Sequence, residues 1–342
     1  MIQVCSILSI PVPDHKTNFN IPCPVCDYSG SGKHLNINIQ KNVFCCPKCS
    51  EKGGILDLYV LMTGLSRKEA FNEIQMRLTG NVTRSVKFAQ YEHPPVIENP
   101  LTDIQTRDQT YKALLSRLKL TKQHHDNLLN RGLNDAQVEM FGYKSAPTFG
   151  TSILAKGLRE DGYSLQGVPG FYRNDKGEWD FYTKRGILIP VRNMYGFIQG
   201  LQIRLDESSD RKYRWISSRD MTDGTASETW CHFVGDPAAD CPIITEGPLK
   251  ADIVSQYMGR TVIAVPGVNS LSHLRDVLQE LRDRGVRTIY IGFDMDYISN
   301  PHVKSGREQL QAILEEYGFC YKTYIWNPYF KGLDDYVTRN KK

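Results

Sequence analysis

Four of the nine cysteines in this sequence form two C-x-x-C pairs near the N-terminus. Cys23 and Cys26 make the first pair, and Cys46 and Cys49 make the second after nineteen intervening residues. Two such pairs can close a tetrahedron of thiolates around Zn²⁺, and a segment too small to bury its own core needs that bond to fold. Because four thiolates leave no open coordination position, we predict one structural Zn²⁺ rather than a catalytic one.

Two details bear on this ligand set. The alternative, chance cysteines in a loop, is disfavoured because both pairs enclose a proline, as CPVC and CPKC. Cys45 is the neighbour of Cys46 and could compete for the metal. Only Cys46 gives the two-residue gap to Cys49 that matches the first pair, so we predict Cys46 as the ligand.

Carboxylates follow two predicted strands in the last third of the chain. Glu246 lies in TEGPLK, and Asp294 and Asp296 lie in FDMD, each motif at the carboxyl end of a strand. Ligands bind at that edge of an open α/β sheet, and converging carboxylates can hold one or two Mg²⁺ or Mn²⁺ ions. A lone D-x-D is more often a solvated strand end or a helix cap. Its pairing with an E-G turn in one alternating unit favours the metal site.

A third acidic motif, KGLDDYV, contains Lys331, Asp334 and Asp335 near the C-terminus. The two aspartates either add to the predicted metal site or belong to a helix N-terminus, where acidic residues are common. The motif by itself supports both interpretations equally.

Basic residues accumulate in the middle of the chain, among aromatic ones. A mixture of this kind is suited to gripping phosphates and stacking bases, although an ordinary solvated sheet face would look similar. We predict a nucleic-acid or nucleotide-binding surface formed by Arg185, Arg192, Arg204, Lys212, Arg214 and Arg219.

Composition limits the class of protein that carries these motifs. The chain has 342 residues, 40% hydrophobic and 23% charged, which predicts a folded globular protein of two or three units. Its net charge of +4 is too small to indicate nucleic-acid binding without the local clusters. No apolar run is long enough to cross a bilayer, and the opening residues resemble no export signal. We therefore expect a cytoplasmic protein with no membrane partner.

The pattern of apolar residues predicts the elements that position the motifs. Residues 1–80 hold the cysteines and two helices, the second of which should begin near Ser66 as its N-cap, with Glu69 three residues on. The polar, proline-containing segment 81–104 is typical of a linker. Helices and then strands follow in 105–238, including a hairpin that turns at Tyr195 and Gly196. Strands and helices alternate over 239–330, which predicts a parallel sheet covered on both faces, and 331–342 is left as a tail. The expected fold class is α+β and multidomain: a zinc ribbon, a mixed α/β basic subdomain and a C-terminal α/β domain.

These segments together resemble the bacterial DnaG-type primases and their phage and plasmid relatives, nearly from end to end. The stretch CPVC…FCCPKCSEKGGILDLYVLMTGLSRKEAF is similar to the primase zinc-binding domain, although Cys26 stands where that family usually has a histidine. LLNRGLNDAQVEMFGYKSAP resembles the N-terminal polymerase subdomain, and RGILIPVRNMYGFIQGLQIR with KYRWISSR resembles its basic strands. TEGPLKAD and GFDMD match the signature of the TOPRIM domain.

The resemblance implies roles for several residues. Glu246 is the expected general acid or base, and Asp294 and Asp296 are the expected magnesium ligands. Lys250 stands where cellular primases carry an acidic residue, as in the primases of mobile elements, and joins the expected nucleotide-binding residues. Asp252 is a candidate for supplying the missing charge.

The implied activity is that of a nucleotidyltransferase in DNA replication. Such an enzyme synthesises short RNA or mixed primers on single-stranded DNA from nucleoside triphosphates, and a separate replicative helicase would be its partner. A TOPRIM fold alone does not select this activity. The alternatives are a catalytically silent nucleic-acid-binding protein and a TOPRIM nuclease that uses the same metals.

Overall fold

The computed structural model describes residues 1–26, 33–47, 49, 51–79, 99–207, 212–268, 270–295, 301–327 and 329–339. The chain divides into two compact units, Met1–Pro95 and Val96–Lys342, and each is treated by itself below.

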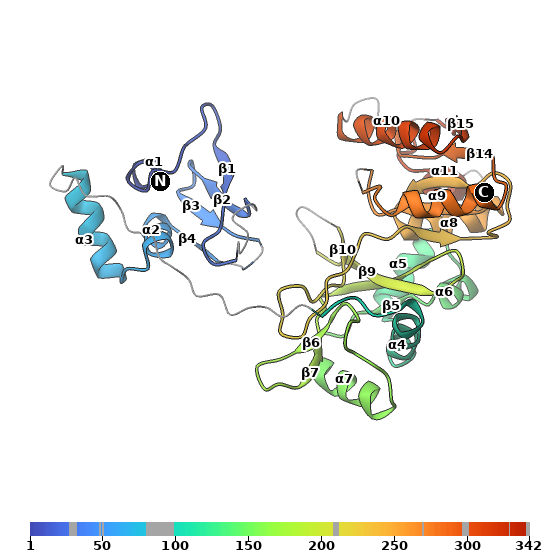
Figure 1. Ribbon diagram of the computed structural model, residues 1–342, viewed down its shortest axis with the longest axis horizontal. Helices are drawn as coiled ribbons and strands as arrows, with labels where there is room; N and C mark the ends of the chain where they lie inside the picture. Colours follow the sequence, from blue (N-terminus) through green and yellow to red (C-terminus); the bar gives the residue numbers. More distant parts are fainter. Residues whose placement is uncertain are drawn as a thin grey trace. The chain divides into compact units, whose positions relative to one another are not determined.

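The N-terminal unit is a small antiparallel sheet with three helices (Figure 1). Its sheet has the order β1-β2-β3-β4, with β1 at Asn18–Ile21, β2 at Leu35–Asn38, β3 at Val43–Cys45 and β4 at Lys52–Gly53. Helices α1 (Ile2–Ile7), α2 (Ile55–Thr63) and α3 (Arg67–Leu78) complete the unit. As predicted, Ser66 caps α3 and forms a reciprocal capping box with Glu69. The buried core of this unit includes three of the paired cysteines.

The second unit begins with three helices, α4 (Ile104–Ser116), α5 (Lys122–Asn130) and α6 (Asp135–Phe141). A four-stranded sheet follows in the order β10-β9-β8-β5, formed by β5 (Lys144–Ser145), β8 (Gly186–Arg192), β9 (Ile198–Leu205) and β10 (Tyr213–Trp215). Helix α7 (Thr151–Glu160) and the strand pair β6 (Phe171–Arg173) and β7 (Trp179–Phe181) lie between β5 and β8 in the chain.

Strands β8 and β9 form the predicted hairpin. The backbone N–H of Asn193 donates to the Phe197 carbonyl, so the turn contains Tyr195 and Gly196 as expected. One difference is that β8 is buried on both faces: Leu188 joins one hydrophobic core, whereas Ile187 and Ile189 join another. The hairpin therefore lies between two cores instead of presenting an open face.

The C-terminal sheet has the strand order β11-β13-β12-β14-β15. Strands β12 (Ile243–Glu246), β13 (Val262–Val265), β14 (Thr288–Ile291) and β15 (Cys320–Thr323) are parallel, as the alternation of strands and helices predicted. Strand β11 (His232–Val234), which precedes the alternating segment, adds an antiparallel edge.

Helices cover both faces of this sheet. Along β12 and β13, alternate residues point to opposite sides, so Ile243 and Val262 join one core and Ile244 and Ile263 join the other. Helices α8 (Pro248–Met258) and α11 (Leu333–Arg339) contribute to the first core, and α9 (Leu274–Asp283) and α10 (Pro301–Glu316) to the second. The predicted fold class is confirmed.

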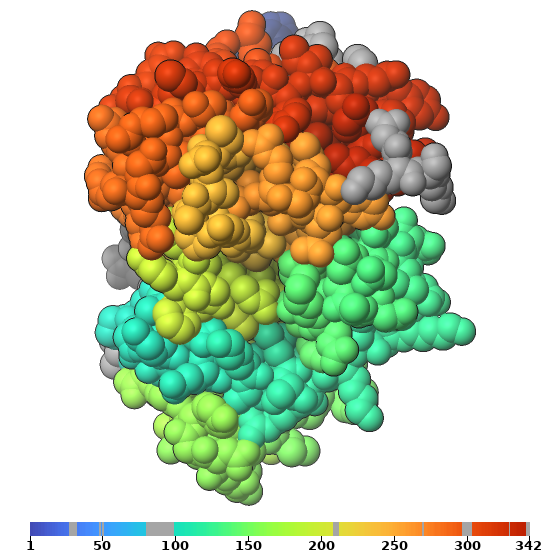
Figure 2. Space-filling model, turned by 90° about the vertical axis from the view of Figure 1, so that its right-hand side faces the viewer, coloured from blue at the N-terminus to red at the C-terminus, as the bar shows by residue number. Residues whose placement is uncertain are grey.

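Two features cross the predicted domain limits. The core under α8 also contains Leu128 of α5 and Ile187 of β8, so a single core joins the basic subdomain to the parallel sheet. Figure 2 shows the same packing from outside, where the surface coloured cyan to yellow-green lies directly against the orange and red surface. The segment predicted as a tail contains α11, whose Leu333 is fully buried.

Candidate active site and zinc centre

The four paired cysteines meet at one end of the N-terminal sheet. Cys23 and Cys26 follow β1, and Cys46 and Cys49 follow β3. Their four sulfur atoms lie within 4.8 Å of one another. Sulfurs around a tetrahedral Zn²⁺ would lie about 3.8 Å apart, given a Zn–S bond of about 2.3 Å, so this arrangement fits zinc.

The environment of these thiols also suits a bound cation. Burial raises the pKa of Cys26 and raises that of Cys49 to about 11, so thiolates here need a compensating positive charge. Cys45 is exposed, because the alternation along β3 turns it away from the buried cluster. The pleat of the strand therefore places Cys46, and not Cys45, in the cluster of four sulfurs.

Glu246 and Asp294 meet at the carboxyl edge of the parallel sheet. Glu246 ends β12, and Asp294 lies three residues beyond the end of β14, which pairs with β12. The backbone N–H of Asp294 donates to Glu246 Oε1 at 3.3 Å. Gly247 follows with φ of +74°, a conformation that favours glycine, and allows the chain to turn from β12 directly into α8.

These acids line a cavity of about 430 Å³, here named the carboxylate cavity. Asp334 and Asp335 also line it and lie in the first turn of α11, which confirms the helix N-terminus, whereas their part in a metal site stays a prediction. Cations from several elements share the lining, namely Arg131, Lys212, Lys250 and Lys331. Arg131 follows α5 within the LLNRGL segment. The sequence analysis did not identify it, because it is far from the acidic motifs along the chain and only the fold brings it to the same cavity.

Lys250 is in direct contact with one of these acids. Its Nζ donates to Asp294 Oδ1, and the side chains of Lys250 and Asp294 are only 16% and 14% exposed. Burial by itself lowers the pKa of this ammonium, but the neighbouring carboxylates, Asp294 first, outweigh burial and raise it. Burial also raises the pKa of Asp334, against the opposing charge of Lys250.

The remaining predicted metal ligands are Asp252 and Asp296. Asp296 lies outside the described residues. Asp252 lies elsewhere, 1% exposed in a buried network: it accepts hydrogen bonds from the Tyr143 hydroxyl and from His232 Nε2, the latter at 2.9 Å. Both of its carboxylate oxygens are therefore engaged away from the carboxylate cavity.

The predicted basic residues do not form one surface. Lys212 lines the carboxylate cavity, and Arg204 lines an adjoining cavity of about 940 Å³ that shares Arg131, Asp334 and Asp335 with it. The charge of Arg204, followed by burial, lowers the pKa of Lys212, as expected for two neighbouring cations. Arg192 instead donates to the carbonyl of Phe141 at the end of α6, at 3.1 Å.

Arg185 and Arg214 line a third cavity, of about 480 Å³, together with Lys184 and Asp206. Arg219 lies on an exposed turn after β10. Both Arg185 and Arg214 are exposed, which suits contact with a phosphate backbone.

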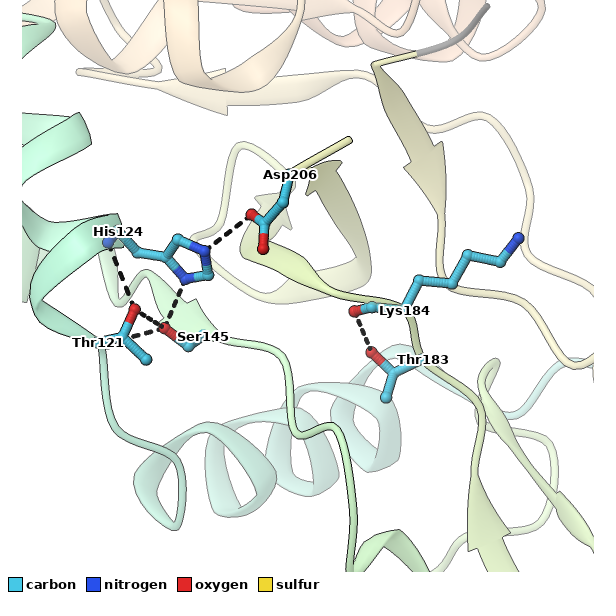
Figure 3. Close-up of polar contacts among 6 residues, drawn as sticks. All are labelled: Thr121, His124, Ser145, Thr183, Lys184 and Asp206. Carbon is cyan, nitrogen blue, oxygen red and sulfur yellow. Dashed lines mark hydrogen bonds and ion pairs between the residues drawn. The ribbon is translucent and has the colours of Figure 1, made fainter. Parts of the chain in front are cut away.

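Asp206, which lines this third cavity, is held by a series of hydrogen bonds that Figure 3 shows. His124 Nε2 lies 2.8 Å from Asp206 Oδ1, and its Nδ1 lies 2.6 Å from Ser145 Oγ. Serine, histidine and aspartate side chains hydrogen-bonded in this order activate the serine nucleophile in hydrolases. Here Ser145 is the buried end and accepts the backbone N–H of Thr121, whereas Asp206 is exposed. These hydrogen bonds therefore orient Asp206 and leave the Ser145 hydroxyl buried.

Within the described ranges, no helix combines the length and the hydrophobicity that a transmembrane span requires.

Residues 236–342 match a family described as a domain of unknown function, DUF3854. No curated protein sequence matches the chain. Among solved structures, it is similar to the zinc-binding and RNA polymerase domains of the Aquifex aeolicus primase, at 15% identity and a TM-score of 0.55, over 99% of this chain and 80% of that one. The RNA polymerase domain of Mycobacterium tuberculosis primase DnaG, with a double-stranded DNA oligomer carrying a 6-nucleotide overhang, gives 15% identity and a TM-score of 0.52, over 70% and 80% of the two chains. At these identities the similarity shows a shared fold.

Proposed function

We propose that this chain is a DNA primase of the TOPRIM type, which joins nucleoside triphosphates into short primers on a single-stranded DNA template. The observation that carries the proposal is the convergence of Glu246, Asp294 and Asp334 on one cavity that cations also line. The fold shared with primase zinc-binding and RNA polymerase domains supports it.

The carboxylate oxygens of this site are the donors that Mg²⁺ and Mn²⁺ prefer. Asp294 and Asp334 would hold such an ion, with Asp335 and Asp296 as further ligands. When bound, the metal would stabilise negative charge on the reacting phosphate and favour ionisation of the attacking 3′-hydroxyl. The proposal includes one or two of these ions and one structural Zn²⁺ at the four cysteines.

Residues of the chain itself supply the other roles. Glu246, held beside the Asp294 backbone, would take the proton of the 3′-hydroxyl. Arg131 and Lys212 would bind the triphosphate, and Arg204 is placed to help, since its buried Nε has no hydrogen-bond partner among the described residues. Arg185 and Arg214 would bind the template backbone, with the zinc unit reading template sequence. The lysine at position 250 favours a mobile-element or phage type of primase that works with a separate helicase.

A primer-synthesis assay on single-stranded DNA with nucleoside triphosphates and Mg²⁺ tests the proposal. We expect Glu246→Gln to retain template binding but to lose about 10²-fold or more in synthesis, because only the proton acceptor is removed. Asp294→Asn should abolish synthesis. Asp276→Asn is a matched control, since this exposed carboxylate of α9 lies outside the cavity lining and should leave synthesis unchanged. Wild-type activity in Glu246→Gln would contradict the assigned role.

One observation favours a second candidate, a silent nucleic-acid-binding protein: Lys250 already occupies an oxygen of Asp294. In that case the wild-type chain would bind the template and synthesise nothing with Mg²⁺ or Mn²⁺. A nuclease would instead degrade the template in the same reaction when the nucleotides are omitted.

A further inference from the structure

Lys250 is enclosed among the acids of the carboxylate cavity. It projects from the first turns of α8, directly after the strand that ends in Glu246, and its Nζ contacts Asp294 Oδ1. On the α11 side, a Cβ atom placed on Gly332 would lie 3.4 Å from both Cε and Nζ of the lysine and would collide with Asp334 Oδ1. The backbone at Gly332 therefore packs closely against both the ammonium and a second carboxylate.

Among the described residues, the charges that line this cavity balance without any added ion. Its acidic lining residues are Glu246, Asp294, Asp334 and Asp335, and its basic ones are Arg131, Lys212, Lys250 and Lys331. Four formal negative charges thus face four positive ones. A divalent cation that enters alone meets no excess of negative charge among these lining residues, and at Asp294 it meets an ammonium already in place.

We propose that Lys250 is a resident counter-ion that competes with divalent metal for Asp294, so that the site binds metal weakly in the absence of substrate. This inference rests on the proposed function, because it assumes that Asp294 is a metal ligand. Its physical basis is that an ammonium and a divalent ion on the same carboxylate repel each other. At about 4 Å this repulsion exceeds the free energy of a tenfold change in affinity, even at the dielectric constant of water.

A titration of the full chain with Mn²⁺, monitored by electron paramagnetic resonance in the absence of nucleotide and DNA, tests the inference. We expect Lys250→Gln to bind Mn²⁺ at least about tenfold more tightly than the wild type, because the competing charge is gone. Lys331→Gln is the matched control: it removes an exposed lysine from the same lining and should change the affinity by less than about threefold, since exposed charges are screened. Adding Asp294→Asn to Lys250→Gln should abolish the gain.

Further variants separate competition from other effects. Lys250→Arg keeps the charge and should keep the weak affinity, and circular dichroism checks that each variant is folded. The inference is overturned if Lys250→Gln binds Mn²⁺ like the wild type, if the gain survives in the double variant, or if Lys250→Arg gains as much as Lys250→Gln.

Failure of the counter-ion role and failure of the proposed function give different results. Primer synthesis by the wild type, with no gain of Mn²⁺ affinity in Lys250→Gln, removes only the counter-ion role. A gain of affinity in a chain that makes no primers removes only the assignment as a primase.

Discussion

Substituting Asp252 tests whether this residue belongs to a buried hydrogen-bond network, as the structure places it, or to the metal site, as the family resemblance suggested. The resemblance made it a candidate to supply negative charge to the metal site. The structure places it 1% exposed, between Tyr143 at 1% and His232 at 2%. His232 Nδ1 accepts the backbone N–H of Arg192 at 3.0 Å, so its Nε2 carries the proton that Asp252 accepts. Burial, followed by the charge of Asp252, raises the pKa of Tyr143 well above its usual value and keeps this hydroxyl a donor.

The expected cost of removing Asp252 follows from these two bonds. Asp252→Ala leaves two buried donors without an acceptor, at about 1–3 kcal/mol each, so we expect a loss of about 2–6 kcal/mol in the free energy of unfolding. Asp252→Asn keeps one acceptor oxygen and should cost about 1–3 kcal/mol. Tyr143→Phe removes one of the same bonds and should cost less than Asp252→Ala.

Urea unfolding, monitored by tryptophan fluorescence, measures the loss in the free energy of unfolding. Trp179, Trp215, Trp230 and Trp326 are the four tryptophans of the chain and all lie in the second unit, so the signal reports on the unit that contains Asp252. Mn²⁺ affinity is measured on the same folded variants. Unchanged stability in Asp252→Ala, or a loss of Mn²⁺ affinity in Asp252→Asn at unchanged stability, would refute the buried network and return Asp252 to the metal site.

Three further predictions concern other parts of the chain. We expect one zinc per chain by metal analysis, lost in Cys46→Ser and retained in Cys45→Ser, because only Cys46 joins the cluster; the reverse pattern would refute the ligand set. Arg214→Ala should weaken binding to single-stranded DNA and reduce the slope of log affinity against log salt by about 0.7, as expected for one lost phosphate contact, and an unchanged slope would make Arg214 part of a solvated face. Hydrogen bonds from Thr106 lower the pKa of Asp103, the N-cap of α4, so its stabilising effect is present at neutral pH and is lost as pH falls through the lowered pKa. The stability of the wild type relative to Asp103→Asn should therefore fall on acidification, and a difference independent of pH in urea unfolding would contradict this.

Signals confined to a few neighbouring residues determined much of this fold in advance. The capping box at Ser66 and Glu69, the hairpin turn at Gly196 and the strand–helix alternation of the last third depend on local backbone preferences and on the period of apolar residues. The cysteine spacing is equally local, since the two-residue gap to Cys49 selected Cys46 over its neighbour. Parallel strands then brought Glu246 to Asp294, because the carboxyl ends of paired parallel strands share one edge.

Only the tertiary structure decided which distant groups surround those motifs. Tyr143 and Arg131 reach Asp252 and Asp334 from over a hundred residues away, and no local pattern encodes such contacts. The burial of β8 on both faces likewise depends on a second core that the alternation of its residues does not reveal. Residues two apart on a helix point about 200° away from each other, so Lys250 and Asp252 face opposite sides of α8. Lys250 thereby enters the carboxylate cavity, whereas Asp252 turns into the core shared with the basic subdomain.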